Sequence, residues 1–208
     1  MHIPDGFLDT KTWISFWAIS FGSLSIAVKK VKNQLEEKTI PLMGVLGAFV
    51  FAAQMLNFPV LNGTSGHFVG GVLIGIILGP YLGLIVMSVI LLLQSLLFAD
   101  GGILTLGANI FNMGLIGTIF GYYIYNFFKK ILKGNFFIAS FIAGWLSVVI
   151  GAFFCSLQLS ISGTVPLSLG LPSMVGIHAL IGIGEGLITS LILSFIFKIR
   201  KDLVYQKV

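Results

Sequence analysis

Residues 81–98 read YLGLIVMSVILLLQSLLF, eighteen consecutive residues without a charge. As an α-helix this stretch would be about 27 Å long, close to the ~30 Å hydrocarbon thickness of a bilayer. The whole chain has the same character, because 57% of its 208 residues are hydrophobic and only 9% are charged. Soluble domains carry roughly 25% charged residues. So few charges cannot cover a water-exposed surface, and the sequence predicts an integral membrane protein.

Seven apolar stretches are candidates for membrane segments. They are residues 12–28, 40–57, 68–79, 81–98, 106–128, 136–159 and 173–197. The third would rise only ~18 Å as a helix, and it is interrupted by glycine and ends before Pro80. We expect it to be short or broken, which a membrane tolerates only where protein or water covers the backbone. The predicted fold is all-α and polytopic, with about seven segments in a single membrane domain over residues 1–208.

Basic residues fall in three connections. KKVKNQLEEK, KKILKGN and KIRKDLVYQKV hold four, three and four of the twelve Lys and Arg residues, eleven in all, and Lys11 is the exception. These connections lie on one side if every stretch crosses, and cytoplasmic loops are the ones enriched in Lys and Arg. We therefore expect the amino terminus outside, the carboxyl terminus inside and no nucleic-acid partner. His2 and His67 then share the outer face.

The tail formed by residues 1–11 begins with a chelating motif, Met1-His2. A free α-amine, the deprotonated amide nitrogen of His2 and its imidazole close two fused rings around one cation and place three nitrogens in a plane. Square-planar nitrogen coordination favours Ni(II) or Cu(II) over Zn(II) or Mg(II). His67 is the candidate for the fourth nitrogen. The alternative is that His2 is incidental in a mobile tail and His67 is an ordinary polar loop residue.

The residues that follow His2 favour a docked tail. Residues 4–6 read Pro-Asp-Gly, a turn signature, in which Asp5 would form a turn with Gly6. We expect Phe7 and Leu8 to be buried against the membrane-embedded body. No charged segment and short apolar run precede this tail, so we expect no cleaved secretory signal.

Polar residues cluster around the end of the fourth stretch and the start of the fifth. They are Gln94, Asp100, Asn109 and Asn112. Polar groups at membrane depth usually face the protein interior and often mark function. We expect them to hold the histidines or the docked tail by hydrogen bonds, or alternatively to satisfy irregular backbone at the outer end of a segment.

Two ionisable residues in the last stretch, His178 and Glu185, are seven positions apart and share one helix face. An intramembrane carboxylate is a functional candidate, and a proton relay through this pair would make the protein a secondary transporter of metal or another small solute. The other interpretation is that Glu185 joins two helices by hydrogen bonds. We favour this structural role.

The sequence holds no G-x-x-x-x-G-K-[ST] motif, so the chain cannot bind ATP through a P-loop. GTSGH, residues 63–67, is not a nucleophile elbow, and we expect no enzymatic activity. The energy for transport would then come from a partner or an ion gradient. Gly44, Ala48 and Ala52 form a small-xxx-small stripe that lets another helix approach closely. We expect this stripe to dock on a partner subunit, or alternatively to pack against the chain's own helices.

Four segments together resemble the substrate-specific membrane subunit of the cobalt/nickel energy-coupling factor transporters, a class of bacterial ABC importers. The segments are MHIPDGFLD, GTSGHFVGGVLIGIILGP, LLLQSLLFADGGILTLGANIFNMG and HALIGIGEGLITS. The resemblance implies a square-planar metal site formed by Met1, His2 and His67, in a bacterial cell membrane. It also implies a transmembrane coupling subunit and a pair of ATPase subunits as partners, and in some systems a small accessory membrane subunit.

The transported ion implied by the resemblance is Ni(II) or Co(II), with no other cofactor. Many cobalt members carry a histidine where this chain has Asp100, and a Ser-Cys-Ser-His stretch where it has GTSGH. These two differences favour nickel over cobalt.

Overall fold

The computed structural model describes residues 1–32, 35, 37–56, 58–60 and 64–205. The helices in these ranges are α1 (Thr10–Val31), α2 (Thr39–Gln54), α3 (Gly71–Leu78), α4 (Pro80–Leu97), α5 (Leu106–Asn109), the π-helix η1 (Ile110–Phe120), α6 (Gly121–Ile131), α7 (Phe136–Ile161), α8 (Leu167–Ile199) and the 3-10 turn η2 (Lys201–Leu203). The architecture is helical as predicted. The prediction missed a short antiparallel hairpin of β1 (Phe58–Val60) and β2 (Thr64–Gly66), in which Phe58 pairs with Gly66.

Each of the seven predicted stretches coincides with helical structure. Four described helices, α1, α4, α7 and α8, are long and apolar enough to cross a membrane. The fifth stretch is a continuous run through α5, η1 and α6. The third is short as predicted, since α3 has eight residues. The seventh predicted stretch, residues 173–197, began too late, because α8 already begins at Leu167 and contains Pro172. Membrane helices tolerate such a proline where neighbouring groups satisfy the freed backbone.

Small residues explain how the short α3 packs inside the protein. A Cβ added to Gly71 would lie 2.6 Å from the Cα of Gly117, and one added to Gly75 would lie 2.6 Å from the carbonyl oxygen of Thr118. The backbones of α3 and η1 are therefore in direct contact, and every residue of α3 is buried. Protein covers this broken segment, as the sequence argument required.

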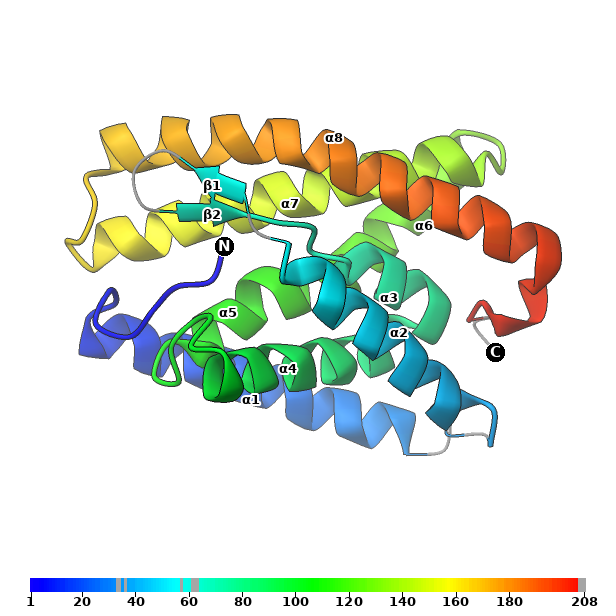
Figure 1. Ribbon diagram of the computed structural model, residues 1–208, viewed down its shortest axis with the longest axis horizontal. Helices are drawn as coiled ribbons and strands as arrows, with labels where there is room; N and C mark the ends of the chain where they lie inside the picture. The colour runs from blue at the N-terminus through cyan, green and yellow to red at the C-terminus, as the bar shows by residue number, and fades with distance from the viewer. Residues whose placement is uncertain (33–34, 36, 57, 61–63, 206–208) are drawn as a thin grey trace.

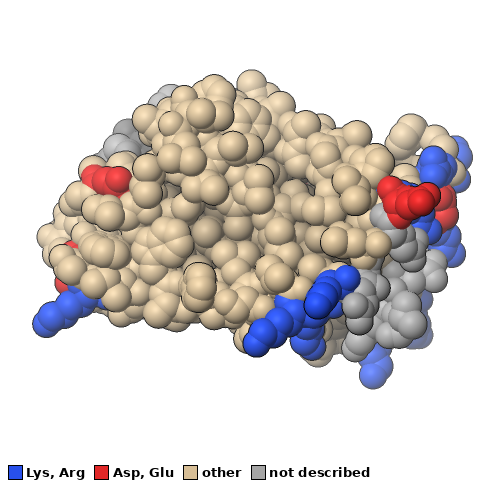
Figure 2. All heavy atoms as spheres, turned by 90° about the horizontal axis from the view of Figure 1, so that it is seen from below, with Lys and Arg blue, Asp and Glu red and all other residues tan. Residues whose placement is uncertain are grey.

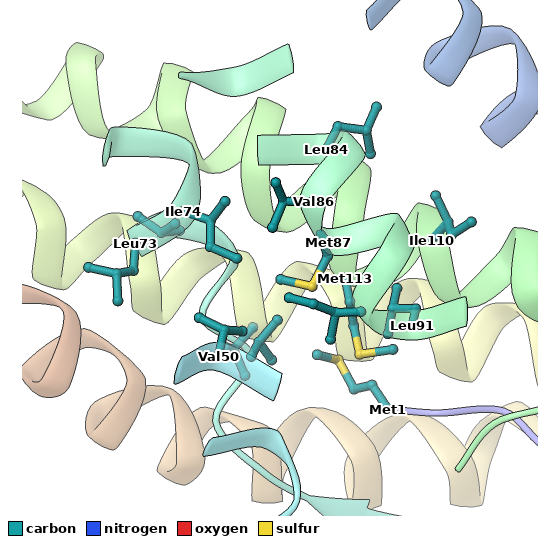
Figure 3. Packing of buried hydrophobic residues seen from close by; sticks show 14 of the residues in the cluster. Met1, Val50, Leu73, Ile74, Leu84, Val86, Met87, Leu91, Ile110 and Met113 are labelled. Carbon is teal, nitrogen blue, oxygen red and sulfur yellow. The ribbon is translucent and has the colours of Figure 1, made fainter. Parts of the chain in front are cut away.

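Two groups of helices enclose α3 and η1. Helices α7 and α8 lie side by side along one edge of the molecule, and α1 and α4 lie along the opposite edge (Figure 1). The buried apolar side chains between them include Leu73, Met87 and Met113, each 0% exposed (Figure 3). On the face shown in Figure 2, most of the Lys and Arg residues lie toward one end of the long axis, and the surface between the two ends is largely uncharged. The amino-terminal tail lies away from that basic end (Figure 1).

Candidate metal centre

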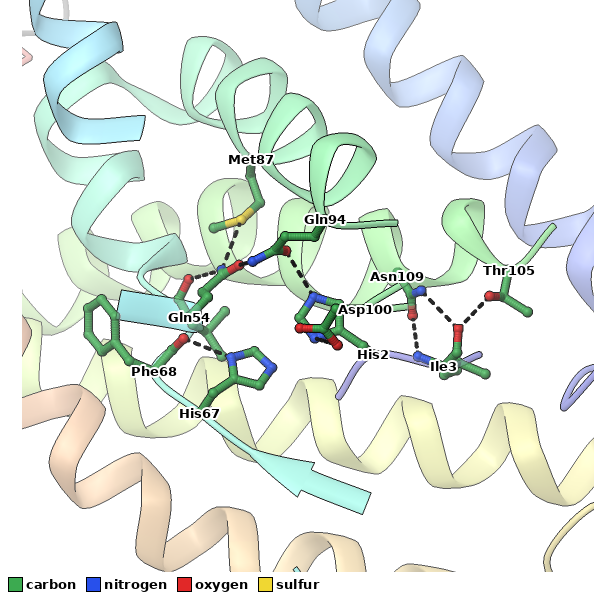
Figure 4. A network of polar contacts seen from close by, with 11 residues as sticks. His2, Ile3, Gln54, His67, Phe68, Met87, Gln94, Asp100, Thr105 and Asn109 are labelled. Atoms are coloured by element: carbon green, nitrogen blue, oxygen red, sulfur yellow. Dashed lines mark hydrogen bonds and ion pairs between the residues drawn. The ribbon is translucent and has the colours of Figure 1, made fainter. Parts of the chain in front are cut away.

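The amino-terminal tail lies across the loop that joins α4 to α5, and Ile3 is the residue that this loop holds. Its backbone N–H donates to Asn109 Oδ1 at 2.9 Å, and Asn109 Nδ2 donates back to its carbonyl oxygen at 3.1 Å. The same carbonyl accepts the backbone N–H of Gly102 at 2.9 Å and the hydroxyl of Thr105. Ile3 is 1% exposed, so these bonds hold the backbone next to His2 inside the protein (Figure 4).

Asp5 adds a second attachment on the same loop. Its two carboxylate oxygens accept the backbone N–H groups of Ile103, Leu104 and Thr105 at 3.1, 2.8 and 3.2 Å respectively. The contact is so close that a Cβ added to Gly102 would lie 2.0 Å from Asp5 Oδ1. Only glycine at position 102 leaves room for the docked tail.

The turn after Asp5 has the predicted form, with Gly6 at φ 85° and Phe7 N–H donating to the Pro4 carbonyl at 3.4 Å. Leu8 is buried as predicted, at 7% exposed, but Phe7 is 44% exposed, so the prediction for Phe7 was wrong. The backbone of Phe7 is held instead, because its carbonyl accepts the Thr164 hydroxyl. Its side chain can therefore remain outside while the tail stays docked.

The side chain of Met1 is an apolar anchor. It is 3% exposed and reaches toward Met113 and Leu91 (Figure 3). Its Sδ atom would lie 3.1 Å from a Cβ added to Gly151 of α7. This packing takes the terminal amine out of water, and burial lowers the pKa of that amine below its ordinary value of 8.0. A lower pKa favours the uncharged amine, the form with a lone pair for a metal.

His2 has one ring nitrogen held and the other available. Nε2 lies 3.1 Å from Gln94 Oε1, whereas Nδ1 is buried with no hydrogen-bond partner and lies 3.4 Å from Asp100 Oδ1. Burial and the neighbouring terminal amine lower the pKa of His2 to about 4, against the opposing effects of Asp100 and Gln94. The ring is therefore neutral at pH 7.

A chain of amides determines which nitrogen of His2 carries the proton. The carbonyl of Val69 can only accept, and it takes the N–H of Gln54 at 2.7 Å. Gln54 Oε1 in turn accepts from Gln94 Nε2 at 2.9 Å, which turns Gln94 Oε1 toward His2 Nε2. His2 must then donate from Nε2, and its lone pair is on Nδ1 (Figure 4). Nδ1 is the nitrogen that can join a chelate with the amine and amide of the same residue pair.

His67 shows the complementary arrangement. Its Nδ1–H donates to the carbonyl of Phe68 at 2.8 Å, and Nε2 is buried without a hydrogen-bond partner. The rings of His2 and His67 face each other with centroids 4.7 Å apart and planes 29° apart. Burial, the terminal amine and His2 keep the pKa of His67 well below 6.5. Two neutral imidazoles thus lie together, each with one lone pair that no protein group uses.

The described part of the chain contains no group of three or more His, Cys, Asp and Glu side chains placed to hold a metal. A site built from an amine, an amide and two imidazoles would contain only two such side chains. The arrangement around Met1, His2 and His67 therefore differs from a conventional side-chain metal cluster.

The other predicted polar residues have separate roles. Asn112 is not at the tail but pairs with Gln158 of α7, by bonds of 2.7 and 3.0 Å. His178 Nδ1–H donates to the Met174 carbonyl at 2.8 Å. Glu185 accepts the backbone N–H groups of Val69 and Gly70 at 2.7 and 2.9 Å. Both oxygens of Glu185 are thus engaged with backbone, in keeping with a structural role, but the partners lie in the connection before α3 and not inside a second helix.

The small-residue stripe lies on the outside of the protein. Gly44, Ala48 and Ala52 are all exposed on α2, and a Cβ added to Gly44 would meet nothing within 4 Å. The alternative that this stripe packs against the chain's own helices is therefore wrong.

Sequence reasoning missed two residues that support the site. Gln54 connects Val69 to Gln94, and Thr105 holds the carbonyl of Ile3. Gln54 is a single amide inside an apolar stretch, and that isolation was a usable signal. The role of Thr105 had no such signal, because it depends on how the tail crosses the loop.

Comparison with known proteins places this chain among metal transporters. A family described as "Cobalt uptake substrate-specific transmembrane region" matches residues 2–203. A putative fused nickel transport protein of Archaeoglobus fulgidus is 44% identical over all of this chain and 69% of its own length. A putative cobalt transport protein of Methanosphaerula palustris is 33% identical over 98% of this chain and 92% of its own. A crystal structure of a transition metal transporter superposes with a TM-score of 0.90, at 34% identity, over 97% of this chain and 94% of that one.

Proposed function

This chain belongs to the cobalt-uptake family of substrate-specific transmembrane proteins, and we propose that it is the subunit that captures Ni(II) or Co(II) at the outer face for an ATP-dependent importer. The terminal amine of Met1, the amide and Nδ1 of His2, and Nε2 of His67 are the four proposed ligands. The observation that carries the proposal is the pair of buried histidines whose hydrogen bonds leave these two nitrogens unused.

The spacing of the two rings is compatible with adjacent corners of a square. With metal–nitrogen bonds of ~2 Å, two imidazoles at right angles on one ion have centroids about 4.4 Å apart. The ring centroids of His2 and His67 are 4.7 Å apart in the structure. The centroid spacing therefore suits two adjacent corners of a square, and a rigid square would disfavour ions that prefer tetrahedral or octahedral surroundings.

The charges around the proposed site also balance. Deprotonation of the His2 amide gives one negative charge, and the carboxylate of Asp100, 3.4 Å from His2 Nδ1, gives another. Together they offset the two positive charges of the ion, which matters because an uncompensated charge is costly in a buried site. Asp100 Oδ2 is buried without a hydrogen-bond partner, so this oxygen is not engaged by another protein group and its charge can stabilise an ion bound nearby.

Transport would depend on other subunits. We assign residues 1–208 to a single membrane domain, with the tail of residues 1–11 docked outside and the basic end of the molecule in the cytoplasm. A chain without a P-loop must obtain ATP hydrolysis from ATPase partners through a transmembrane coupling subunit. The exposed stripe of Gly44, Ala48 and Ala52 is the proposed contact with that coupling subunit, and a small accessory membrane subunit would complete some assemblies.

Nickel is the favoured ion. The reason is the carboxylate of Asp100 beside His2, at a position where many cobalt transporters that this chain resembles carry histidine, together with the GTSGH sequence. Relatives are named for nickel and for cobalt, so their names do not decide between the two ions.

The direct test is metal binding by purified protein with an unblocked amino terminus, measured as metal content and as affinity for Ni(II). Acetylation of the Met1 amine should abolish tight binding, because it removes one ligand. His67→Ala should weaken binding by at least 10–100-fold, the range seen when even outer partners of a metal site are lost. A tag at the carboxyl terminus is the control and should change nothing. Full-affinity Ni(II) binding by the acetylated protein would refute the proposed ligand set.

A further inference from the structure

Glu185 is a buried carboxylate that lies on α8 but bonds to a distant part of the chain. It is 2% exposed, and its two oxygens accept the backbone N–H groups of Val69 and Gly70 at 2.7 and 2.9 Å. These N–H groups lie in the short connection between His67 and α3. The carboxylate is thus hydrogen-bonded to the segment that carries His67, the proposed fourth ligand.

The two backbone N–H groups that bond to Glu185 have no hydrogen-bond partner within α3. Gly70 is in the left-handed conformation at φ 72° and immediately precedes α3, so its N–H and that of Val69 precede the first turn and have no partner within the helix. Both residues are buried, Val69 at 3% exposed. A carboxylate at this helix start satisfies both donors and is stabilised by the helix dipole.

Val69 connects the hydrogen bonds of Glu185 to His2 as well as to His67. Its N–H is held by Glu185, and its carbonyl accepts from Gln54, which begins the amide chain that ends at His2 Nε2. One residue thus connects the carboxylate to both imidazoles. His67 depends on it because it is two residues away along the backbone, and His2 depends on it through Gln54 and Gln94.

We propose that Glu185 is the positioning residue of the metal site: it fixes the connection after His67 so that His67 Nε2 faces the tail chelate and the amide chain keeps its direction. It does not touch the ion. This inference rests on the proposed function and adds a residue of α8 to it. A simple helix-joining role would change stability when Glu185 is altered, but it would leave the geometry of bound nickel unchanged.

Glu185→Gln is the decisive variant. The amide keeps the size of the side chain but presents an NH₂ group to one of the two backbone donors, so one of the bonds to Val69 and Gly70 is lost. Thr189→Val is the matched control, because Thr189 lies one turn along α8, is 0% exposed and has a hydroxyl without a hydrogen-bond partner. Each protein is measured for Ni(II) affinity, for the visible absorption spectrum of bound nickel and for thermal stability without metal.

We expect Glu185→Gln to weaken Ni(II) binding at least tenfold and to shift the nickel spectrum, while Thr189→Val keeps the wild-type values. Wild-type affinity and spectrum in Glu185→Gln would overturn the inference, whatever happens to stability. If Glu185→Gln does not fold, Glu185→Asp is used, since its shortened carboxylate cannot reach both N–H groups without moving the connection. Unchanged binding and spectrum in that variant would also overturn it. Failure of the wild-type protein to bind nickel would instead count against the proposed function.

Discussion

A single methyl group at position 102 should disable the metal site without altering any proposed ligand. In Gly102→Ala the new Cβ would lie 2.0 Å from Asp5 Oδ1 and 2.3 Å from the Asp5 backbone nitrogen. Because one of these atoms is backbone, rotation of the Asp5 side chain cannot relieve the clash. The tail itself must move by about an ångström, which is the difference from an ordinary contact.

The expected magnitude follows from the bonds that such a movement breaks. Ile3 has a buried N–H that donates to Asn109 and a carbonyl that accepts from Gly102, Asn109 and Thr105. An orphaned buried donor costs about 1–3 kcal/mol, and each lost hydrogen bond removes about 0.5–1.5 kcal/mol. A total of about 3 kcal/mol corresponds to a loss of ~100-fold in a binding constant. This cost lowers the measured Ni(II) affinity, because the tail must be docked before its nitrogens and His67 can bind the same ion.

The assay is Ni(II) titration of detergent-purified protein against a competing chelator, with amide hydrogen exchange of the tail as a second measurement. Gly22→Ala on α1 is the matched control, because its added Cβ meets nothing within 4 Å and should slightly favour the helix. We expect Gly102→Ala to lose at least two powers of ten in affinity and to show fast exchange in the tail, and Gly22→Ala to do neither. Wild-type affinity in Gly102→Ala would mean that docking of the tail does not form the site.

Three further outcomes are expected. His178→Ala should leave the spectrum of bound nickel unchanged, and a shift in His178→Ala without one in His67→Ala would make His178 the ligand in place of His67. Ala48→Leu should prevent co-purification of the partner subunits and abolish transport while metal binding stays intact; normal co-purification and transport would show that the stripe is not the contact. Lowering the pH from 6.5 to 4 should weaken docking of the metal-free tail, because His2 has a pKa of about 4 when docked and near 6.5 in water, so the undocked state binds the additional proton. Tail amides whose exchange, relative to the intrinsic rate at the same pH, is as slow at pH 4.5 as at pH 6.5 would contradict this.

The sequence by itself determined the class of protein and the identity of the candidate ligands. The backbone N–H and C=O groups of a long uncharged stretch need hydrogen-bond partners. In a bilayer the α-helix is the structure that pairs all of them within one segment. The interrupted stretch at residues 68–79 was likewise readable, because glycine and proline act locally on the backbone. The Met1-His2 chelate is also local, since its three nitrogens belong to adjacent residues. His67 could be proposed from its side of the membrane alone.

The tertiary structure decided how these ligands are held. Which nitrogen of His2 is free depends on an amide chain from α2, α4 and the connection to α3, and no local pattern connects residues so far apart. The same is true of Glu185, whose helix position was readable but whose partners, Val69 and Gly70, were not. Phe7 is exposed and Leu8 buried because the docked backbone, and not hydrophobicity, sets the direction of each side chain. Hydrogen bonds have direction and reach only about 3 Å, so they are fixed only once packing has brought distant segments together.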